Sequence, residues 1–276
     1  MAQVINTNLA AINAQRNLSS TQGSMQTAIQ RLSSGLRVNS AKDDAAGLSI
    51  ASRMDAQARG MSVAIRNASD GISMAQVAEG ALGKVSDMLQ RMRELAIQSA
   101  NATNNSTDRD SLNAEYAELS EEIGRTVSST RFNGGTILAS TTAMEFQIGA
   151  SNDTSDRLTV AATDLSASMA AVAATSVTGT DSSNARLAID ALDSAMTTIN
   201  SKRAEFGAIQ NRFEAVISNL QIAAENQQSS RSRIMDADFA AETAAMTRAQ
   251  ILQQAGTAML AQANQLPQQV LRLLQN

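Results

Sequence analysis

A seven-residue repeat of large apolar residues near the C-terminal end restricts the fold of this chain more than any other feature. The repeat consists of Leu252, Met259, Leu266 and Leu273, with Gly256, Ala263 and Val270 forming a second row between them. Such a stripe lets one helix pack along another. It predicts a long helix over residues 250–274 that requires a helical partner.

The partner is predicted at the opposite end of the chain, where a second apolar set has helical spacing. Its residues are Ile5, Leu9 and Ile12, followed by Met25, Ile29, Leu32 and Leu36. We expect the two ends to pair with each other and then with other copies of the molecule. The predicted assembly seam therefore comprises this N-terminal set together with Leu252, Met259, Leu266, Val270 and Leu273.

Three further stretches with helical periodicity lie between the two ends. Apolar residues recur every three or four positions over 61–96, again over 112–123, and again over 189–220. A polar turn at 101–108 separates the first two helices, which we expect to be antiparallel. The segment NSAKDD at 39–44 predicts a helix start, with Asp43 and Asp44 as capping carboxylates. A catalytic acid pair is the alternative interpretation, but the sequence offers it no partner base.

The periodicity changes after residue 130. The segment FNGG at 132–135 is typical of a tight turn, and alternating residues at 144–148 and 158–160 predict a β-hairpin. Residues 163–184 are rich in Ser, Thr and Ala with little pattern. We interpret them as an exposed tip or linker, whose hydroxyls are either solvated or sites of O-linked modification.

These elements predict a mainly α fold. We expect an elongated antiparallel coiled coil or helical bundle formed by both chain ends, with a small β-hairpin region at the far end. Breaks at 33–35 and at a predicted hinge over 229–238 suggest two domains. Residues 1–43 and 236–276 would form a terminal coiled-coil domain, and residues 44–235 a helical-bundle domain with the hairpin near 132–160 and the tip near 163–184.

The composition argues against catalysis, nucleic-acid binding and membrane insertion. The chain contains no His and no Cys, which removes the commonest general base, the commonest metal ligands and any thiol chemistry. We therefore predict no catalytic residues, no metal site and no cofactor. The net charge of −4 gives no electrostatic case for nucleic acid. Neither a cleavable signal peptide nor a membrane span is expected.

Five stretches of the sequence resemble bacterial flagellin, the subunit of the flagellar filament. They are Arg31–Met54 (RLSSGLRVNSAKDDAAGLSIASRM), Gln90–Asn101 (QRMRELAIQSAN), Thr130–Leu138 (TRFNGGTIL), Ser230–Glu242 (SRSRIMDADFAAE) and Arg248–Leu274 (RAQILQQAGTAMLAQANQLPQQVLRLL). They occur in the family's order. Only about twenty weakly patterned residues stand where many flagellins carry an outer domain, so the resemblance is to a short form that lacks one.

The resemblance implies a structural subunit that polymerises into the filament used for swimming. It implies an extracellular location, reached through the flagellar type III export system without a cleaved signal peptide. The implied partners are other copies of the chain, an export chaperone on the C-terminal segment, the filament cap and the hook-associated proteins. Recognition by the innate immune flagellin receptor is also implied, through the matching residues Arg91, Leu95 and Glu115.

The rival interpretations explain less of the sequence. GALGK at 80–84 is too short for a phosphate-binding loop and lies within a helical stretch, so an enzyme is disfavoured. A small coiled-coil adaptor would explain the apolar stripes but not the ordered motifs. The ending AQANQLPQQVLRLL resembles that of the bulk filament subunit rather than that of a hook–filament junction protein. A single helix with one partner is only marginally stable. We therefore expect both ends to be disordered in the free monomer and to fold on assembly.

Overall fold

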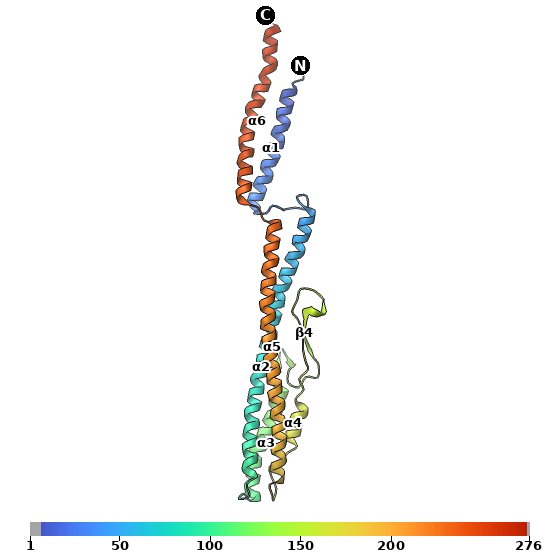
Figure 1. Cartoon of the computed structure of the whole chain (residues 1–276), viewed down its shortest axis with the longest axis vertical. Helices are drawn as coiled ribbons and strands as arrows, with labels where there is room; N and C mark the ends of the chain where they lie inside the picture. The colour runs from blue at the N-terminus through green and yellow to red at the C-terminus, as the bar shows by residue number, and fades with distance from the viewer. Residues whose placement is uncertain (1–6, 275–276) are drawn as a thin grey trace. The chain divides into compact units, whose positions relative to one another are not determined.

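The computed structural model describes residues 7–274, with side chains described for residues 7–265. Within this part the chain forms six α-helices: α1 (Leu9–Ser34), α2 (Ala45–Ser99), α3 (Ser106–Ser129), α4 (Ser166–Ala173), α5 (Ser183–Met235) and α6 (Phe239–Leu274). Two small antiparallel pairs are formed by β1 (Arg131–Phe132) with β2 (Gly135–Thr136), and by β3 (Met144–Gln147) with β4 (Arg157–Val160). The predicted mainly α fold is confirmed (Figure 1).

The chain divides into two compact units. A terminal unit combines Met1–Ala56 with Asn226–Asn276, and a central unit comprises Gln57–Glu225. The division falls inside α2 and α5, whereas the domain boundaries predicted from the sequence fall where these helices start and stop. Those predicted boundaries stay a prediction.

In the terminal unit, α1 and α6 lie side by side and antiparallel, so the predicted pairing of the two chain ends is confirmed (Figure 1). Helix α1 ends at Gly35, which adopts a left-handed conformation (φ 71°) and donates its backbone N–H to the carbonyl of Arg31. The predicted hinge over 229–238 is too long, because α5 continues to Met235. Ile234 and Met235 pack against Val38 and Ala51, which keeps this polar-looking stretch helical.

The central unit is organised around the apolar face of α2. Eight residues of the predicted repeat are fully buried: Ala68, Ala75, Ala78, Leu82, Val85, Leu89, Met92 and Ala96. Helix α3 begins with a capping box in which Asn105 and Asp108 each accept a hydrogen bond from the other's backbone N–H. The predicted tight turn is confirmed, since Asn133 (φ 47°) and Gly134 (φ 82°) connect β1 to β2.

The order of elements in the sequence predicted the β3–β4 hairpin at the far end of the helices, but the hairpin does not lie there. Asn67 donates its side-chain amide to the carbonyl of Gln147 at 2.9 Å, and Phe146 packs edge-to-face on Phe213 with ring centroids 5.3 Å apart. These contacts set the hairpin against the middle of α2 and α5. An isolated two-stranded hairpin is at best marginally stable, so it folds back to bury its apolar face.

The segment 163–184 is not the exposed tip that its composition suggested. It contains α4, and its large apolar residues belong to the central core: Leu165, Met169, Val172 and Val177. Thr175 hydrogen-bonds the hydroxyl of Tyr116 at 2.7 Å. The first three apolar residues are spaced four and three apart, which is a short helical face concealed among Ser, Thr and Ala. O-linked modification of the remaining hydroxyls stays a prediction.

Candidate assembly surface

The inner face of α1 is a heptad stripe made largely of small side chains. The residues on it that are buried or half-buried against α6 are Ala11, Ala14, Leu18, Thr21, Met25, Ala28 and Leu32. Their spacing alternates three and four, as a two-helix seam requires. Only Leu18, Met25 and Leu32 are large and apolar, so the surface that α1 turns toward its partner is shallow.

Helix α6 presents a matching stripe. Its inward residues are Glu242, Met246, Ala249, Gln253, Gly256, Leu260 and Ala263. We call the two stripes together the inner seam. Three contacts fix its register: the side-chain amide of Asn8 donates to the carbonyl of Ala263 at 2.7 Å, Leu18 covers Gly256, and Arg31 pairs with Glu242 at 3.7 Å. This register sets the large side chain of Leu18 opposite the small Gly256.

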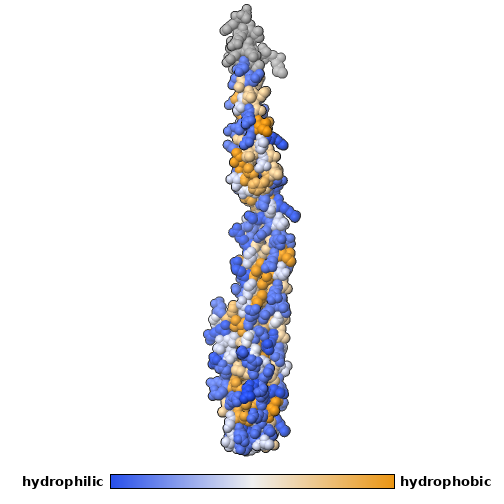
Figure 2. All heavy atoms as spheres, turned by 90° about the vertical axis from the view of Figure 1, so that its left-hand side faces the viewer, coloured by the Kyte–Doolittle hydropathy of each residue, from blue (hydrophilic) through white to orange (hydrophobic). Residues whose placement is uncertain are grey.

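Large apolar residues also lie on the outside of the same helix pair. The exposed ones are Leu9, Ile12 and Ile29 on α1, and Phe239, Ile251, Leu252 and Met259 on α6. We call these seven residues the outer apolar set. Leu9 is 62% exposed and Met259 is 64% exposed. On the face drawn in Figure 2, hydrophobic patches interrupt the hydrophilic surface of the terminal helix pair.

The residues of the predicted assembly seam are thus divided between the two surfaces. Met25 and Leu32 lie on the inner seam, and Leu36 is half-buried beyond the end of α1. Leu9, Ile12, Ile29, Leu252 and Met259 belong to the outer apolar set. Ile5 lies outside the described residues, and Leu266, Val270 and Leu273 lie outside the described side chains. The sequence interpretation identified only part of the inner stripe (Met25, Leu32, Gly256 and Ala263), because its other alanines and its threonine carry a weak heptad signal.

A concave, open patch on α6 overlaps the outer apolar set. It is lined by Thr243, Ala244, Thr247, Arg248, Ile251 and Leu252. Apolar surface rimmed by one cation and two hydroxyls is typical of a place where another helix docks rather than of a catalytic pocket. Within the described residues there is also no cluster of side chains able to hold a metal ion.

The segment that follows α1 caps the end of α5, and the segment that follows α5 caps the end of α1. The backbone N–H groups of Arg37 and Val38 donate to the carbonyl of Met235, at the C-terminal end of α5. In return the N–H of Ala237 donates to the carbonyl of Gly35, at the end of α1. The Arg37 guanidinium also donates to the carbonyl of Ile234 at 2.7 Å. This reciprocal capping satisfies carbonyls that helix ends would otherwise leave unpaired.

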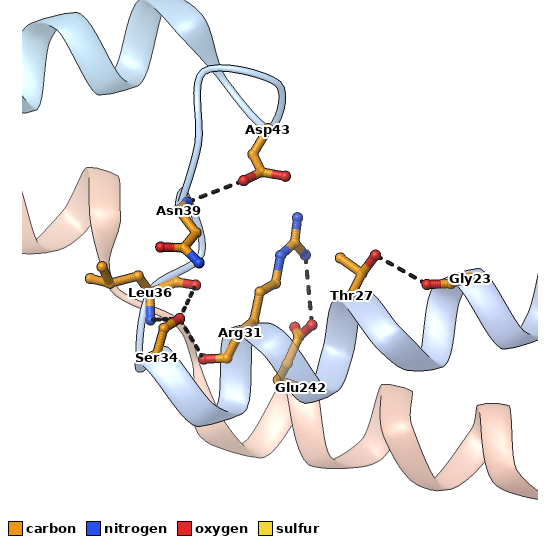
Figure 3. A network of polar contacts seen from close by, with 8 residues as sticks. All are labelled: Gly23, Thr27, Arg31, Ser34, Leu36, Asn39, Asp43 and Glu242. Carbon is orange, nitrogen blue, oxygen red and sulfur yellow. Dashed lines mark hydrogen bonds and ion pairs between the residues drawn. The ribbon is translucent and has the colours of Figure 1, made fainter.

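Figure 3 draws part of the polar network around this junction, including Arg31, Asp43 and Glu242. Arg31 of α1 reaches Glu242 in the first turn of α6, where the carboxylate also suits the helix dipole. Asp44 accepts the N–H of Gly47 and caps α2, as predicted. Asp43 does not cap α2. Its carboxylate turns back and accepts the backbone N–H groups of Asn39 and Ser40 and the Ser40 hydroxyl.

These hydrogen bonds change the acidity of Asp43. The Ser40 hydroxyl, followed by the two backbone N–H groups, holds the pKa of the Asp43 carboxyl below its usual value. The interpretation of Asp43 and Asp44 as a catalytic pair finds no support, because each carboxylate is occupied by backbone donors. Their role is to shape the connection between α1 and α2.

The residues matched to the immune-receptor site lie in the central unit. Arg91 of α2 makes two hydrogen bonds to Glu115 of α3, at 2.9 and 3.3 Å, and a third to Glu94 at 3.0 Å. The side chains of Arg91 and Glu115 are about half exposed. Leu95 is different, since it is 1% exposed and belongs to the core. Arg91 and Glu115 therefore form an accessible pair, whereas Leu95 is buried in the core.

Among the described residues, every helix falls short of the length and apolar character that a membrane span requires.

Two protein-family models match this chain, one at each end. Residues 5–143 match the family model for the bacterial flagellin N-terminal helical region, and residues 189–274 match that for the C-terminal helical region. The 45 residues between the two matches hold the β3–β4 hairpin and α4, which leaves no room for a large outer domain.

Individual relatives cover almost the whole chain. The chain is 49% identical over 272 residues to a flagellin of Halalkalibacterium halodurans, covering 98% of this chain and 99% of that protein. It is 42% identical over 288 residues to the flagellar filament 33 kDa core protein of Treponema phagedenis, covering 98% and 99%. The crystal structure of Bacillus cereus flagellin is 37% identical with a TM-score of 0.50, and it covers 56% of this chain and 88% of that one.

Proposed function

Because this chain belongs to the bacterial flagellin family, whose members build the flagellar filament and are not enzymes, we propose that its outer apolar set packs copies together in that filament. The observation that carries the proposal is the division of apolar residues between two surfaces. The inner seam, half of whose residues are small, holds α1 to α6, while Ile251, Leu252 and Met259 stay exposed. Large apolar side chains gain most from burial.

The inner seam supports a second part of the proposal, which concerns the free monomer. Half of the inner-seam residues are Ala, Gly or Thr, which bury little apolar area each, so the α1–α6 pair gains only modest stability from within. We infer that both chain ends are disordered before assembly and fold when neighbouring copies cover the outer apolar set. Amide exchange tests this inference. Strong protection of residues 11–32 in the monomer, before any polymer forms, would overturn it.

The outer apolar set is also the surface to which we expect other proteins to bind before and during assembly. An export chaperone on the C-terminal segment would cover Leu252 and Met259 before assembly, and passage through the flagellar type III system would then deliver the chain to the growing end. The filament cap and the hook-associated proteins would meet the same terminal helices at the two ends of the filament. Purified chaperone that fails to protect α6 from amide exchange would contradict the first of these partnerships.

The assembly surface is tested by substitution on α6. A Leu252→Gln or Met259→Gln variant keeps helix-compatible side chains but removes apolar area. We expect a large rise in the monomer concentration needed for polymerisation, measured by sedimentation. The matched control is Leu187→Gln, which changes an equally exposed leucine (63%) on α5 of the central unit. Normal polymerisation of both α6 variants would rule out this surface.

A second function, recognition by the innate immune flagellin receptor, is favoured by one observation. The Arg91–Glu115 pair is half exposed and held in a fixed geometry by two hydrogen bonds, so it presents a preformed polar epitope. An Arg91→Ala variant would leave Glu115 without this partner and should weaken receptor activation. Leu95→Ala is not an equivalent test, because removing a buried leucine creates a cavity and loosens the core. Unchanged activation by the Arg91 variant would contradict this function.

A further inference from the structure

The methionines of this protein are distributed unevenly between core and surface. Among those whose side chains the structure describes, Met74, Met92, Met169 and Met235 are buried. All the others except one are half-buried, Met25 and Met246 in the inner seam among them. The exception is Met259, which is 64% exposed on α6 and belongs to the outer apolar set. A thioether in this position is open to any oxidant dissolved in water.

We propose that Met259 is a site of reversible oxidation by peroxide, and that its oxidation blocks assembly of the free subunit. In the reaction, the thioether sulfur attacks the terminal oxygen of hydrogen peroxide. One oxygen atom is transferred to sulfur, the O–O bond breaks, and water leaves. The sulfur is oxidised by two electrons to the sulfoxide and the peroxide is reduced, so atoms and electrons balance. This inference rests on the proposed role of the outer apolar set.

Oxidation removes the apolar character of the Met259 side chain, on which the proposed assembly depends. Methionine is a flexible apolar side chain that adapts to irregular packing surfaces, whereas the sulfoxide carries a strongly polar S–O group. Burying that group against apolar side chains of a neighbouring copy leaves it without a hydrogen-bond donor, which is unfavourable. A subunit oxidised at Met259 would therefore remain unpolymerised until methionine sulfoxide reductase restores the thioether.

The location of Met259 makes the modification depend on the state of assembly. Before polymerisation the side chain is exposed whether or not α1 and α6 are paired, because it faces away from the inner seam. Met25 and Met246 are half-buried in the paired helices and become as accessible as Met259 when the pair opens. Within the polymer, a neighbouring copy would cover Met259 and protect it. Oxidation would then prevent free subunits from polymerising and leave the subunits of existing filaments unmodified.

The test uses full-length monomer and hydrogen peroxide as the oxidant. Monomer is treated briefly, the peroxide is removed with catalase, and sulfoxide at each methionine is quantified by peptide mass spectrometry. Seeded polymerisation then gives the critical concentration by sedimentation. We expect sulfoxide at Met259 in the treated monomer, and the critical concentration to rise at least tenfold in proportion to it. Preformed filaments given the same dose should retain Met259 as the thioether.

Two variants make the result decisive. Met259→Leu keeps an apolar side chain that cannot form a sulfoxide, so treated and untreated protein should polymerise alike. If peroxide still blocks this variant, another methionine is responsible and the inference is wrong. Normal polymerisation of wild-type monomer carrying sulfoxide at Met259 would also overturn it.

The untreated Met259→Gln variant separates this inference from the proposal beneath it. If this variant polymerises normally, then Met259 is not part of the assembly surface. The proposed assembly role of Met259 and the oxidation inference are then both wrong. If it is blocked while sulfoxide-bearing wild-type protein polymerises normally, the surface stands and only the oxidation inference fails.

Discussion

The side chain of Leu18 on α1 fills the space that Gly256 leaves on α6. A Cβ atom added to Gly256 would stand 3.2 Å from Cδ1 of Leu18, which is tighter than ordinary van der Waals contact. Glycine normally weakens a helix interior by roughly 1 kcal/mol relative to alanine. Its presence in the middle of α6 is explained by this close approach, which lets a large residue of one helix nest against the backbone of the other.

This contact predicts that Gly256→Leu disturbs the inner seam. The new side chain improves helix propensity but forces the two helices apart, and overpacking of this kind costs about 1–3 kcal/mol. If the pair folds on assembly, that cost appears as a roughly tenfold rise in critical concentration for each 1.4 kcal/mol. Sedimentation of the polymer measures it.

The matched control for this prediction is Gly23→Leu on α1. A Cβ atom at Gly23 meets nothing within 4 Å, so this change has the same effect on propensity without the clash. It should leave the critical concentration unchanged or lower it. An equal rise for both variants would show that the Leu18–Gly256 contact is not what limits the pairing of α1 with α6.

The junction between the helices gives a second prediction. Replacing Arg37 by Met removes the guanidinium bond to the carbonyl of Ile234 but keeps the backbone bonds to Met235. We expect a loss of about 1 kcal/mol in local stability, because the bond is exposed to solvent. Faster amide exchange at Val38 and Ala237 in assembled filaments would report it. Lys42→Met, in the same connection, should leave both exchange rates unchanged.

Asp43 gives a prediction about pH. Its pKa is lower in the folded chain than in the unfolded chain, so its contribution to stability is complete above the unfolded value near 3.8. That contribution disappears as the pH falls through the lowered folded pKa. The amides of Asn39 and Ser40 should therefore stay protected, relative to their intrinsic exchange rates, from neutral pH down to about pH 4 and lose protection below. An Asp43→Asn variant should lack this transition, and an identical transition in that variant would assign it to another group.

Helical periodicity located most of the fold because large apolar residues repeat in it without interruption. The stripe from Ala68 to Ala96 in α2 is buried as predicted, and the FNGG turn has the two positive φ angles that its residues favour. The hairpin was recognised, but its position was not. Alternation along β3 shows that one face is buried, yet it does not show that Phe146 packs on Phe213 rather than at an end of the unit.

For the candidate assembly surface, the sequence predicted the apolar stripe but not the partner that the stripe contacts. The heptad of Leu252 and Met259 was identified, but a heptad does not reveal which partner it meets. In this chain α6 carries two stripes, an inner one of small, polar and a few large apolar residues that meets α1, and an outer one of large apolar residues. The inner stripe has the weaker hydrophobic signal, so only the structure separates them. Leu95 illustrates the same point, since the motif that contains it does not show that this leucine is buried.

The last prediction concerns Arg109, which is 3% exposed and ties the end of α2 to the segment before α5. Its guanidinium donates to the carbonyls of Ser99, Gly179 and Asn101 at 3.0, 3.2 and 3.4 Å. Arg109→Met fills similar space but leaves three carbonyls without this donor, and we expect the central unit to lose about 3 kcal/mol. For a unit of this size the thermal midpoint should fall by roughly 6–12 °C, measured by circular dichroism of the monomer. Arg186→Met on the exposed face of α5 should change it by about 1–2 °C at most. Equal, small shifts in both variants would mean that the carbonyls find other donors and that Arg109 is not the clamp at this end of the unit.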